Sequence, residues 1–416
     1  MKILALNCGS SSLKYQLFDW EKKEVIAIGI IERIGIGGSF IKHEVPSEDK
    51  EIKKETPISN HEIAIQLVLD ALTEGEGAVI SGMSEISAVG HRVVHGGEKF
   101  NRSVLIDDDV VNAIKEVSHL APLHNPANLI GIEAGRIALP DVPHIAIFDT
   151  AFHQTIPAHA YMYAVPYEWY QNNSVRRYGF HGTSHLYVSK RAAALLGKDA
   201  DKCNVITLHI GNGVSCCAIK DGVSVDTSMG LTPLEGAIMG TRSGDIDPAI
   251  PMFMMQQLDV GPRYMDSLLN KKSGILGITG KYTDRRDVLE GAEKGDEKCK
   301  LAMDMECYRL RKYVGEYAAV LGRLDAIVFT AGVGENAGAI REKILEDLEV
   351  FGLEIDKEKN LKTFSKHGET EISTPKSRVR VYVIPTNEEL VFVEDVVGIL
   401  EKTYDDHMKY PYSFLK

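Results

Sequence analysis

Residues 3–18 read ILALNCGSSSLKYQLF, which is an apolar run, a turn of small polar residues and a second apolar run. Residues 205–219 read VITLHIGNGVSCCAI and repeat this pattern in the second half of the chain. Each pattern predicts two antiparallel strands joined by a tight turn. The second copy continues through Lys220-Asp221-Gly222-Val223, whose Asp-Gly pair is typical of a hairpin turn. The repeat predicts an α/β fold made of two duplicated domains, each opening with an antiparallel meander.

Helix signals follow both meanders and alternate with short apolar strands. Strands are expected at 144–148, ending abruptly at Asp149, and at 325–330. Two capping boxes, Ser59 with Glu62 and Thr386 with Glu389, mark helix starts. Glycines mark the ends of two further helices. The four predicted helices are 63–72, 184–196, 296–321 and a last one that runs through Leu400.

The composition restricts the class of protein. A chain of 416 residues, 44% of them hydrophobic, is too long for one core, so two domains are expected. The net charge of -12 gives no bulk attraction for nucleic acid or anionic membranes. No uncharged stretch reaches the ~18 residues of a membrane span. The six cysteines form no CxxC pair, so we expect reduced thiols in a cytoplasmic protein.

The turn from Asn7 to Ser12 is the first candidate for anion binding. Its small residues let backbone amides approach a phosphate closely, and Lys14 on the returning strand can add a positive charge. An ordinary Gly/Ser hairpin is the competing interpretation. The matching turn at 211–213 favours a different picture, in which two glycine-rich hairpins clamp the phosphates of a nucleotide between the domains.

Arg92 and Arg242 lie in glycine-rich loops, within GHRVVHGG and GTRSGD. Such arginines are poorly placed for salt bridges along a helix and suit bidentate binding of carboxylate or phosphate, although a surface arginine is the simpler interpretation of either one. His181 and His185 are spaced like a metal-binding pair. Gly182 and the expected helix cap at Ser184 separate them, which disfavours zinc and leaves His181 as a hydrogen-bond donor.

A second glycine-rich turn, 331–336, follows a strand and opens a helix, a common setting for phosphate binding. A tight turn without a ligand remains the alternative, and no Walker A loop is present. Asp149 ends a strand at the edge where α/β sites are built. Glu388 follows Asn387 at a helix start and is free to bind a hard cation such as Mg²⁺.

Together these residues resemble the acetokinase family of acyl-phosphate-forming kinases. The resemblance implies the actin-like, sugar kinase and Hsp70-type fold, with two ribonuclease H-like domains and an interdomain nucleotide cleft. We expect residues 1–150 and 386–416 in the first domain and 151–385 in the second. The matching stretches span almost the whole chain: 7–14, 90–97, 177–185, 209–213, 239–245, 331–336 and 385–390.

The resemblance also implies a role for each site residue. Asn7 and Glu388 would hold Mg²⁺, which Mn²⁺ could replace. Arg92, Arg242 and His181 would surround the transferring phosphoryl group, with Asp149 as the essential acid. Acetate would lie against Arg92 in a small pocket of Val94, Leu123, Phe180 and Pro233. The residues expected to contact ATP or ADP are Lys14, His209, Ile210, Gly211, Asn212, Gly213, Asp284, Arg285, Arg286, Gly332, Val333, Gly334, Glu335 and Asn336.

The implied reaction is the reversible transfer of the ATP γ-phosphoryl group to acetate, giving acetyl phosphate and ADP, in a homodimeric enzyme. Acetate is already ionised at pH 7, so the reaction needs no general base. It needs positive charge, because one anion attacks another. We therefore expect direct in-line displacement. Asp149 would orient Mg²⁺ or an arginine instead of accepting a proton.

Three other functions remain open. Propionate or butyrate kinase differs only in pocket size, and one methylene changes selectivity by only ~1–3 kcal/mol; Val94 favours acetate. A sugar kinase would need a true base for its hydroxyl nucleophile. An ATPase switch related to actin or Hsp70 would lack the paired arginines and the small apolar pocket.

Overall fold

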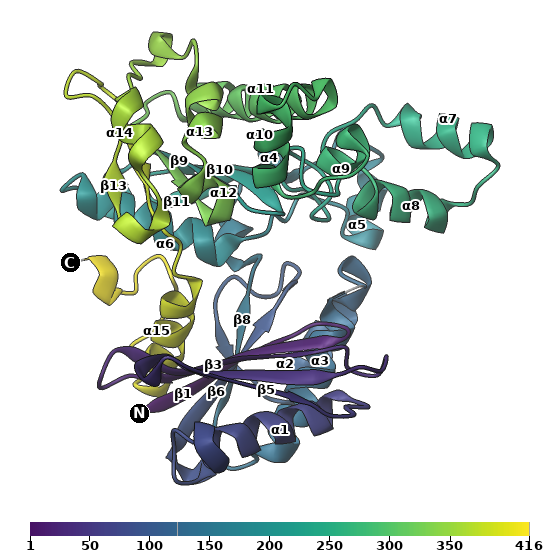
Figure 1. Cartoon of the computed structure of the whole chain (residues 1–416), viewed down its shortest axis with the longest axis vertical. Helices are drawn as coiled ribbons and strands as arrows, with labels where there is room; N and C mark the ends of the chain where they lie inside the picture. The colour runs from purple at the N-terminus through teal and green to yellow at the C-terminus, as the bar shows by residue number, and fades with distance from the viewer. Residues whose placement is uncertain (123, 416) are drawn as a thin grey trace. The chain divides into compact units, whose positions relative to one another are not determined.

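The computed structural model describes residues 1–122 and 124–415. The chain divides into two compact units (Figure 1). Unit 1 comprises Met1–Phe152 and Glu388–Tyr412, and unit 2 comprises His153–Asn387 together with the residues that follow Tyr412. The predicted first domain included the whole tail from 386 onward, whereas unit 1 ends at Tyr412. Arg191 donates to the Phe414 carbonyl oxygen, and the Phe414 ring packs 4.8 Å from Tyr187.

Unit 1 is built on a sheet whose strand order is β5-β4-β3-β2-β1-β6-β8-β7. The first five strands in this order form an antiparallel meander, which consists of the two predicted strands β1 and β2 and three further strands. Strands β1, β6 and β8 are parallel to one another. The strands are β1 (Lys2–Cys8), β2 (Ser12–Asp19), β3 (Glu24–Glu32), β4 (Phe40–Val45), β5 (Lys50–Glu55), β6 (Ile86–Val93), β7 (Val104–Leu105) and β8 (His144–Phe148).

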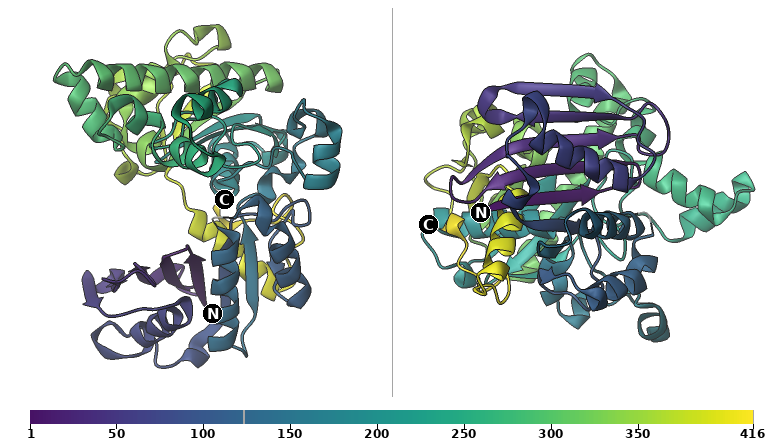
Figure 2. Two further views of the ribbon diagram at one scale, coloured as in Figure 1. Left: turned by 90° about the vertical axis from the view of Figure 1, so that its right-hand side faces the viewer. Right: turned by 90° about the horizontal axis from the view of Figure 1, so that it is seen from below.

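Helices cover both faces of this sheet. The helices α1 (His61–Thr73) and α3 (Asn125–Ala138) bury one face, which carries Leu4 and Leu6 of β1. The opposite face, which carries Ile3, packs against α15 (Glu388–Leu400), drawn in yellow in Figures 1 and 2. The remaining α-helix, α2 (Asp108–Glu116), lies beside α3. The last helix of the chain thus belongs to the unit with which the chain begins.

Unit 2 repeats the same plan. Its strand order is β11-β10-β9-β12-β14-β13, in which β11-β10-β9 is an antiparallel meander and β9, β12 and β14 are parallel. This matches β3-β2-β1-β6-β8 of unit 1 and confirms the predicted duplication. The strands are β9 (Val205–Ile210), β10 (Val214–Lys220), β11 (Val223–Thr227), β12 (Ala326–Thr330), β13 (Thr370–Glu371) and β14 (Arg380–Val383).

The predicted hairpin between β10 and β11 is confirmed, because Asp221 and Gly222 both have positive φ, 50° and 80°. The long helix is also confirmed, with Asp296 capping it and Gly322 ending it at φ 68°. The helices of unit 2 are α4 (Ala158–Tyr161), α5 (Tyr167–Asn173), α6 (Gly182–Leu195), α7 (Ala249–Leu258), α8 (Pro262–Lys271), α9 (Gly274–Thr279), α10 (Arg285–Glu293), α11 (Glu297–Leu321), α12 (Ala331–Asn336), α13 (Gly338–Leu345) and α14 (Lys357–Lys362).

Three helix starts differ from the predictions. The N-cap of α1 is Asn60, not Ser59, because the Asn60 carboxamide oxygen accepts from the Ile63 N–H at 3.0 Å. Helix α6 begins at Gly182, before the predicted cap at Ser184. Helix α15 begins at Glu388, one residue later than a cap at Thr386 requires, and the Thr386 hydroxyl lies 2.9 Å from that of Ser184.

All six cysteines are free and buried, as predicted. None of the helices in the described ranges is both long and apolar enough to cross a membrane.

A buried carboxyl group on α15 makes stability depend on pH. Asp395 accepts hydrogen bonds from the hydroxyls of Ser103 and Tyr412, both at 2.6 Å, and burial raises its pKa from 3.8 to about 7. The folded protein therefore holds a proton that the unfolded chain has released. The contribution of this group to the free energy of unfolding is greatest at acidic pH and falls between pH 4 and pH 7.

Asp395→Asn removes this pH dependence, because asparagine carries no charge at any pH. The melting temperature of the variant relative to the wild type is expected to rise from pH 5 to pH 8 in a series of thermal melts. Asp405→Asn, at an exposed position in the same tail, is the control and should give a constant difference. If the melting temperatures of Asp395→Asn and the wild type differed by the same amount at every pH, the prediction would be contradicted.

Candidate active site

The predicted site residues fall into two sets, one in each unit. In unit 1, the alternation of side chains along the strands aligns the first set. The face covered by α15 carries Ile3 on β1, Ala88 on β6 and Ile147 on β8. Asn7, Arg92 and Asp149 continue these three rows at the carboxyl ends of the parallel strands. The ladder extends past β8, because the Asp149 N–H donates to the Val93 carbonyl oxygen at 3.1 Å.

Glu388 reaches the same edge from α15. A Cβ atom on Gly90 would lie 2.2 Å from the Phe392 ring, so only glycine allows α15 to pack this closely on β6. Glu388 precedes Phe392 by four residues and so lies on the same side of the helix. Arg92 follows Gly90 by two residues on the same face of β6. The structure therefore brings Asn7, Arg92, Asp149 and Glu388 to one edge of the sheet.

Arg92 and Asp149 form a bidentate ion pair. The Nε and Nη2 atoms of Arg92 donate to the two carboxylate oxygens of Asp149 at 2.9 and 2.6 Å. Asp149 is buried, and its negative charge raises the pKa of Arg92. A carboxylate held on both oxygens by a guanidinium is poorly placed to accept a proton. This geometry suits the orientation of an arginine.

Asn7 and Glu388 are the residues of this set that could hold a divalent cation. Both are half-buried, and neither side chain has a hydrogen-bond partner within residues 1–122 and 124–415. Burial raises the pKa of Glu388 to about 7, although the charge of Arg92 opposes the shift. The described residues contain no cluster of three or more His, Cys, Asp or Glu side chains that would enclose a metal. Two oxygen ligands are nevertheless enough for Mg²⁺, which keeps water and phosphate oxygens around it.

Two further predicted residues lie near this edge. Lys14 is exposed on β2 and pairs directly with Asn7 on β1, so their side chains share a face of the sheet. Val94 is half-buried just after β6, and its N–H donates to the Asn128 side chain at 3.1 Å. Leu123 lies outside the described residues.

In unit 2, His181 lies at the turn before α6. It has a left-handed backbone conformation, with φ 58°, and its ring stacks on His209 at 4.1 Å. The Ser215 hydroxyl lies 2.8 Å from Nδ1 of His181 and 2.7 Å from Nε2 of His185. Burial lowers the pKa of His185 well below its ordinary value. Because one hydroxyl has one proton, Ser215 donates to at most one of the two rings and accepts from the other or from both.

Arg242 lies beside His181 and has no carboxylate partner within residues 1–122 and 124–415. A Cβ atom on Gly213 would lie 3.3 Å from the His181 ring and 3.6 Å from the Arg242 guanidinium, so the three residues are close together. The Nη1 atom of Arg242 donates to the Pro233 carbonyl oxygen at 3.1 Å. Burial lowers the pKa of Arg242, and the described part of the chain places no acid within 4.0 Å of its guanidinium. A half-buried cation without an acid beside it is suited to bind an anion.

A cavity of about 730 Å³ lies in unit 2. This volume is within the range of sites that bind small molecules. Eight of the predicted nucleotide contacts line it: Gly211, Asn212, Asp284, Arg285, Arg286, Gly332, Val333 and Asn336. Four lining residues were not predicted: Thr283, Leu289, Ala337 and Phe364. Leu289 could have been found, since it lies one helical turn after Arg285, but nothing in the sequence around Phe364 indicates a role.

The structure places His209, Ile210, Gly213, Gly334 and Glu335 outside the lining of this cavity. Ile210 is in the core, and Glu335 accepts from the Thr386 N–H at 3.1 Å. Arg285 forms a buried ion pair with Glu306 of α11 at 2.7 Å.

Asp284 caps α10 and accepts hydrogen bonds from Arg286, which lower its pKa to about 2. Asp284 therefore stays ionised beside the cavity.

Comparison with known proteins gives one consistent result. The model of the acetokinase family matches residues 2–394. The acetate kinase of Trichlorobacter lovleyi is 65% identical over 100% of this chain and 99% of its own length. A crystal structure of Porphyromonas gingivalis acetate kinase has a TM-score of 0.92 at 47% identity, covering 96% of this chain and 99% of that one. A propionate kinase from Francisella tularensis has a TM-score of 0.87 at 42% identity, covering 95% and 98%.

Proposed function

Because the chain belongs to the acetokinase family, we propose that its two sets of charged residues promote direct in-line transfer of the γ-phosphoryl group of ATP to acetate. The chain is an enzyme that transfers a phosphoryl group between ATP and acetate, with ATP or ADP as its co-substrate. One observation carries the proposed mechanism. Arg242 is half-buried, lies next to His181 and Gly213, and has no acid beside it among the described residues.

The charges of this site match what the reaction needs. The nucleophile is an ionised carboxylate, which attacks a phosphoryl group that is itself negative. Arg242 supplies a permanent positive charge, and His181 supplies a hydrogen-bond donor held in place by Ser215. Such groups stabilise the charge on the equatorial oxygens of the transition state. No residue has to accept a proton from the nucleophile.

Arg92 acts from the other set. Two N–H groups of Arg92 donate to Asp149, which fixes the plane of the guanidinium. The Nη1 side of Arg92 is left to face substrate oxygens. We assign Asp149 the role of orienting Arg92. The distances support this role, because a base would need a free carboxylate oxygen.

Asn7 and Glu388 are proposed to hold Mg²⁺ or Mn²⁺. A bound Mg²⁺ neutralises negative charge on phosphate oxygens. Glu388→Gln keeps the shape of the side chain and removes its charge, so we expect Mn²⁺ affinity in the presence of ADP to fall by about tenfold or more. Electron paramagnetic resonance titration of free Mn²⁺ measures this. Glu389→Gln, at the neighbouring exposed position, is the control, and equal affinities for the two variants would contradict the assignment.

The nucleotide is proposed to bind in the cavity of unit 2. The cavity is lined by Gly211 and Asn212 of one glycine-rich turn, by Gly332 and Val333 of another, and by Arg286, which is permanently charged. Apolar atoms of Leu289 and Phe364 offer a surface for the base of the nucleotide. Lys14 is proposed to contact the phosphates from unit 1.

The acyl group is proposed to contact Val94, Leu123, Phe180 and Pro233. The identities favour acetate, since relatives at 64–65% identity are acetate kinases and the propionate kinase structure is 42% identical. Discrimination by one methylene is limited, so some activity with propionate is expected.

A homodimer is proposed from an exposed apolar surface on α7 and α8, which extend away from the sheet of unit 2 (Figure 1). No residue of α7 is buried, and Met252 and Phe253 are 60% and 58% exposed. Such a surface favours association with a second copy of the chain. Light scattering should give twice the mass of one chain. The double variant Met252→Asp, Phe253→Asp should be monomeric, whereas Val350→Asp, also strongly exposed, should not; a dimer in the double variant would contradict this surface.

The two units are proposed to be the domains, with the second inserted into the first. The six buried free thiols support a reducing, cytoplasmic location.

An acyl phosphate assay tests the proposed function. Hydroxylamine traps acyl phosphate as a hydroxamate, and the assay is run with formate, acetate, propionate and butyrate. We expect acetate to give the highest kcat/KM, propionate a lower value and butyrate little product. A higher kcat/KM with propionate or butyrate would show that this longer acid, and not acetate, is the preferred substrate. A rate of ATP hydrolysis that none of the four acids changes would favour an ATPase switch.

A further inference from the structure

The loop of residues 228–236 follows β11 and leads towards Arg242. It carries Pro233, whose carbonyl oxygen accepts from Arg242 at 3.1 Å. The position of this loop therefore affects both the proposed acyl pocket and the cation beside it. None of its residues lines the 730 Å³ cavity. A residue that fixes this loop would influence acyl binding without touching the nucleotide.

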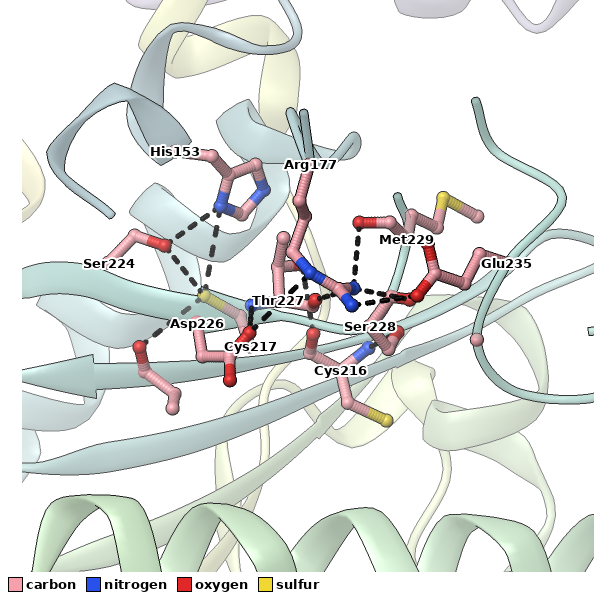
Figure 3. Close-up of polar contacts among 12 residues, drawn as sticks. His153, Arg177, Cys216, Cys217, Ser224, Asp226, Thr227, Ser228, Met229 and Glu235 are labelled. Carbon is pink, nitrogen blue, oxygen red and sulfur yellow. Dashed lines mark hydrogen bonds and ion pairs between the residues drawn. The ribbon is translucent and has the colours of Figure 1, made fainter. Parts of the chain in front are cut away.

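Arg177 contacts both ends of this loop (Figure 3). Its Nη1 atom donates to the carbonyl oxygens of Thr227, Ser228 and Met229, at 2.6, 3.1 and 3.4 Å. Its Nη2 atom donates to Glu235 at 2.7 Å. The side chain is only 18% exposed, so these bonds are shielded from water. One planar guanidinium thus holds the beginning and the end of the loop, which the single ammonium of a lysine cannot do.

The chain around Arg177 makes further bonds to the same loop. The backbone N–H groups of Tyr178 and Gly179 donate to the Gly230 carbonyl oxygen at 3.0 and 3.3 Å. On the far side, Tyr163 donates to Glu235 and accepts from the Leu231 N–H at 3.0 Å. The loop is therefore bound at its start, middle and end.

The same segment leads directly to His181. Arg177 precedes His181 by four residues, and the Gly179 between them has φ 77°; a Cβ atom there would lie 2.3 Å from Thr227. Thr227 ends β11 directly before the loop, and the bonds of Tyr178 and Gly179 to Gly230 reach the loop itself, so the turn that presents His181 packs against the loop that carries Pro233. Their alignment depends on the contacts of Arg177.

We propose that Arg177 is a positioning residue for the acyl substrate: it holds the 228–236 loop so that Pro233 and Arg242 fit acetate and exclude longer acids. This inference rests on the proposed function. Arg177 touches the loop and not the substrate, so it acts through Pro233 and Arg242. Glu235 and Tyr163 complete the arrangement as its partners.

The test uses the full-length enzyme with Arg177→Lys, Arg177→Ala and Glu235→Gln. The readouts are kcat, the KM values for acetate and ATP, the ratio of kcat/KM for propionate to that for acetate, and ADP affinity by calorimetry. In Arg177→Lys we expect the KM for acetate to rise about tenfold and the propionate-to-acetate ratio to rise several-fold. An apolar pocket discriminates by only about 10- to 200-fold per methylene, so a loosened wall should reduce this visibly.

The ADP affinity and the KM for ATP should stay within about twofold of the wild type. Arg191→Lys is the matched control, because Arg191 also pairs with a carboxylate, that of Glu369, but contacts no residue of the loop. It should leave the acyl ratio unchanged. Of the contacts that Arg177 makes, Glu235→Gln weakens only the one with Glu235. It should raise the propionate-to-acetate ratio by a smaller factor than Arg177→Lys. This variant keeps the inference testable if Arg177→Ala does not fold.

An unchanged acyl ratio in a folded Arg177→Lys would overturn the inference, as would equal increases in the KM values for acetate and ATP. Failure of the wild type to form a hydroxamate with any of the acids would instead overturn the proposed function. The two failures are thus distinguishable.

Discussion

Arg242→Ala is expected to lower kcat for acetyl phosphate formation by about 10³-fold or more, the effect of removing an arginine that stabilises a phosphoryl transition state. Arg242 has no acid beside it among the described residues, so its charge is available to the substrate. Arg242→Lys keeps the charge and loses the planar fork. It should recover only a small part of the rate.

ADP affinity checks that the loss is catalytic. Arg242 does not line the 730 Å³ cavity, so the affinity of Arg242→Ala for ADP should match that of the wild type. Arg323→Ala removes an arginine that is 55% exposed and belongs to neither set of site residues, so it should leave kcat unchanged. A loss of less than about tenfold in a folded Arg242→Ala would remove this residue from the proposed mechanism.

Asp149→Asn is expected to lower kcat by about 10²-fold, the order of loss produced by small misplacement of a catalytic group. Asparagine cannot hold the Arg92 guanidinium through two charged oxygens, so Arg92 loses its orientation. The pH–rate profile should keep every limb that the wild type shows. Loss of a limb would mean that Asp149 exchanges a proton in the reaction.

Arg92→Ala separates orientation from direct action. If Asp149 works only through Arg92, the double variant Arg92→Ala, Asp149→Asn should have a kcat only slightly lower than that of Arg92→Ala alone. The reason is that the effects of residues that act as a unit are strongly non-additive. Full additivity of the two losses would show that Asp149 contacts the reacting groups itself.

The local elements of the fold were predictable from the sequence. The two meanders, the Asp221-Gly222 turn and the helix capped by Asp296 all depend on neighbouring residues, so short-range patterns are enough to find them. The cap of α1 was missed by one position, because Ser59 and Asn60 are adjacent and both are good capping residues. Helix α6 starts early, because His181 takes a left-handed conformation that no local pattern indicates.

The pairings between distant residues were not predictable. The sequence predicted that Arg92 suits a carboxylate or phosphate and that Asp149 orients Mg²⁺ or an arginine, but only the structure shows that these two residues pair with each other. Arg285 lines the cavity proposed for the nucleotide, but its ion pair with Glu306, on a different helix, was not predicted. Arg177 carried no role in the sequence, because its partners lie 50 or more residues further along the chain. Such partners meet only when the strands are arranged in the sheet.

The stereochemical course at phosphorus tests direct in-line transfer most directly. The measurement uses ATP with a γ-phosphoryl group made chiral by oxygen isotopes and determines the configuration in acetyl phosphate. Attack of acetate on the phosphorus atom, supported by Arg92, Arg242 and His181, predicts inversion. Retention of configuration would contradict the account, because it requires two displacements and a phosphorylated residue of the enzyme between them.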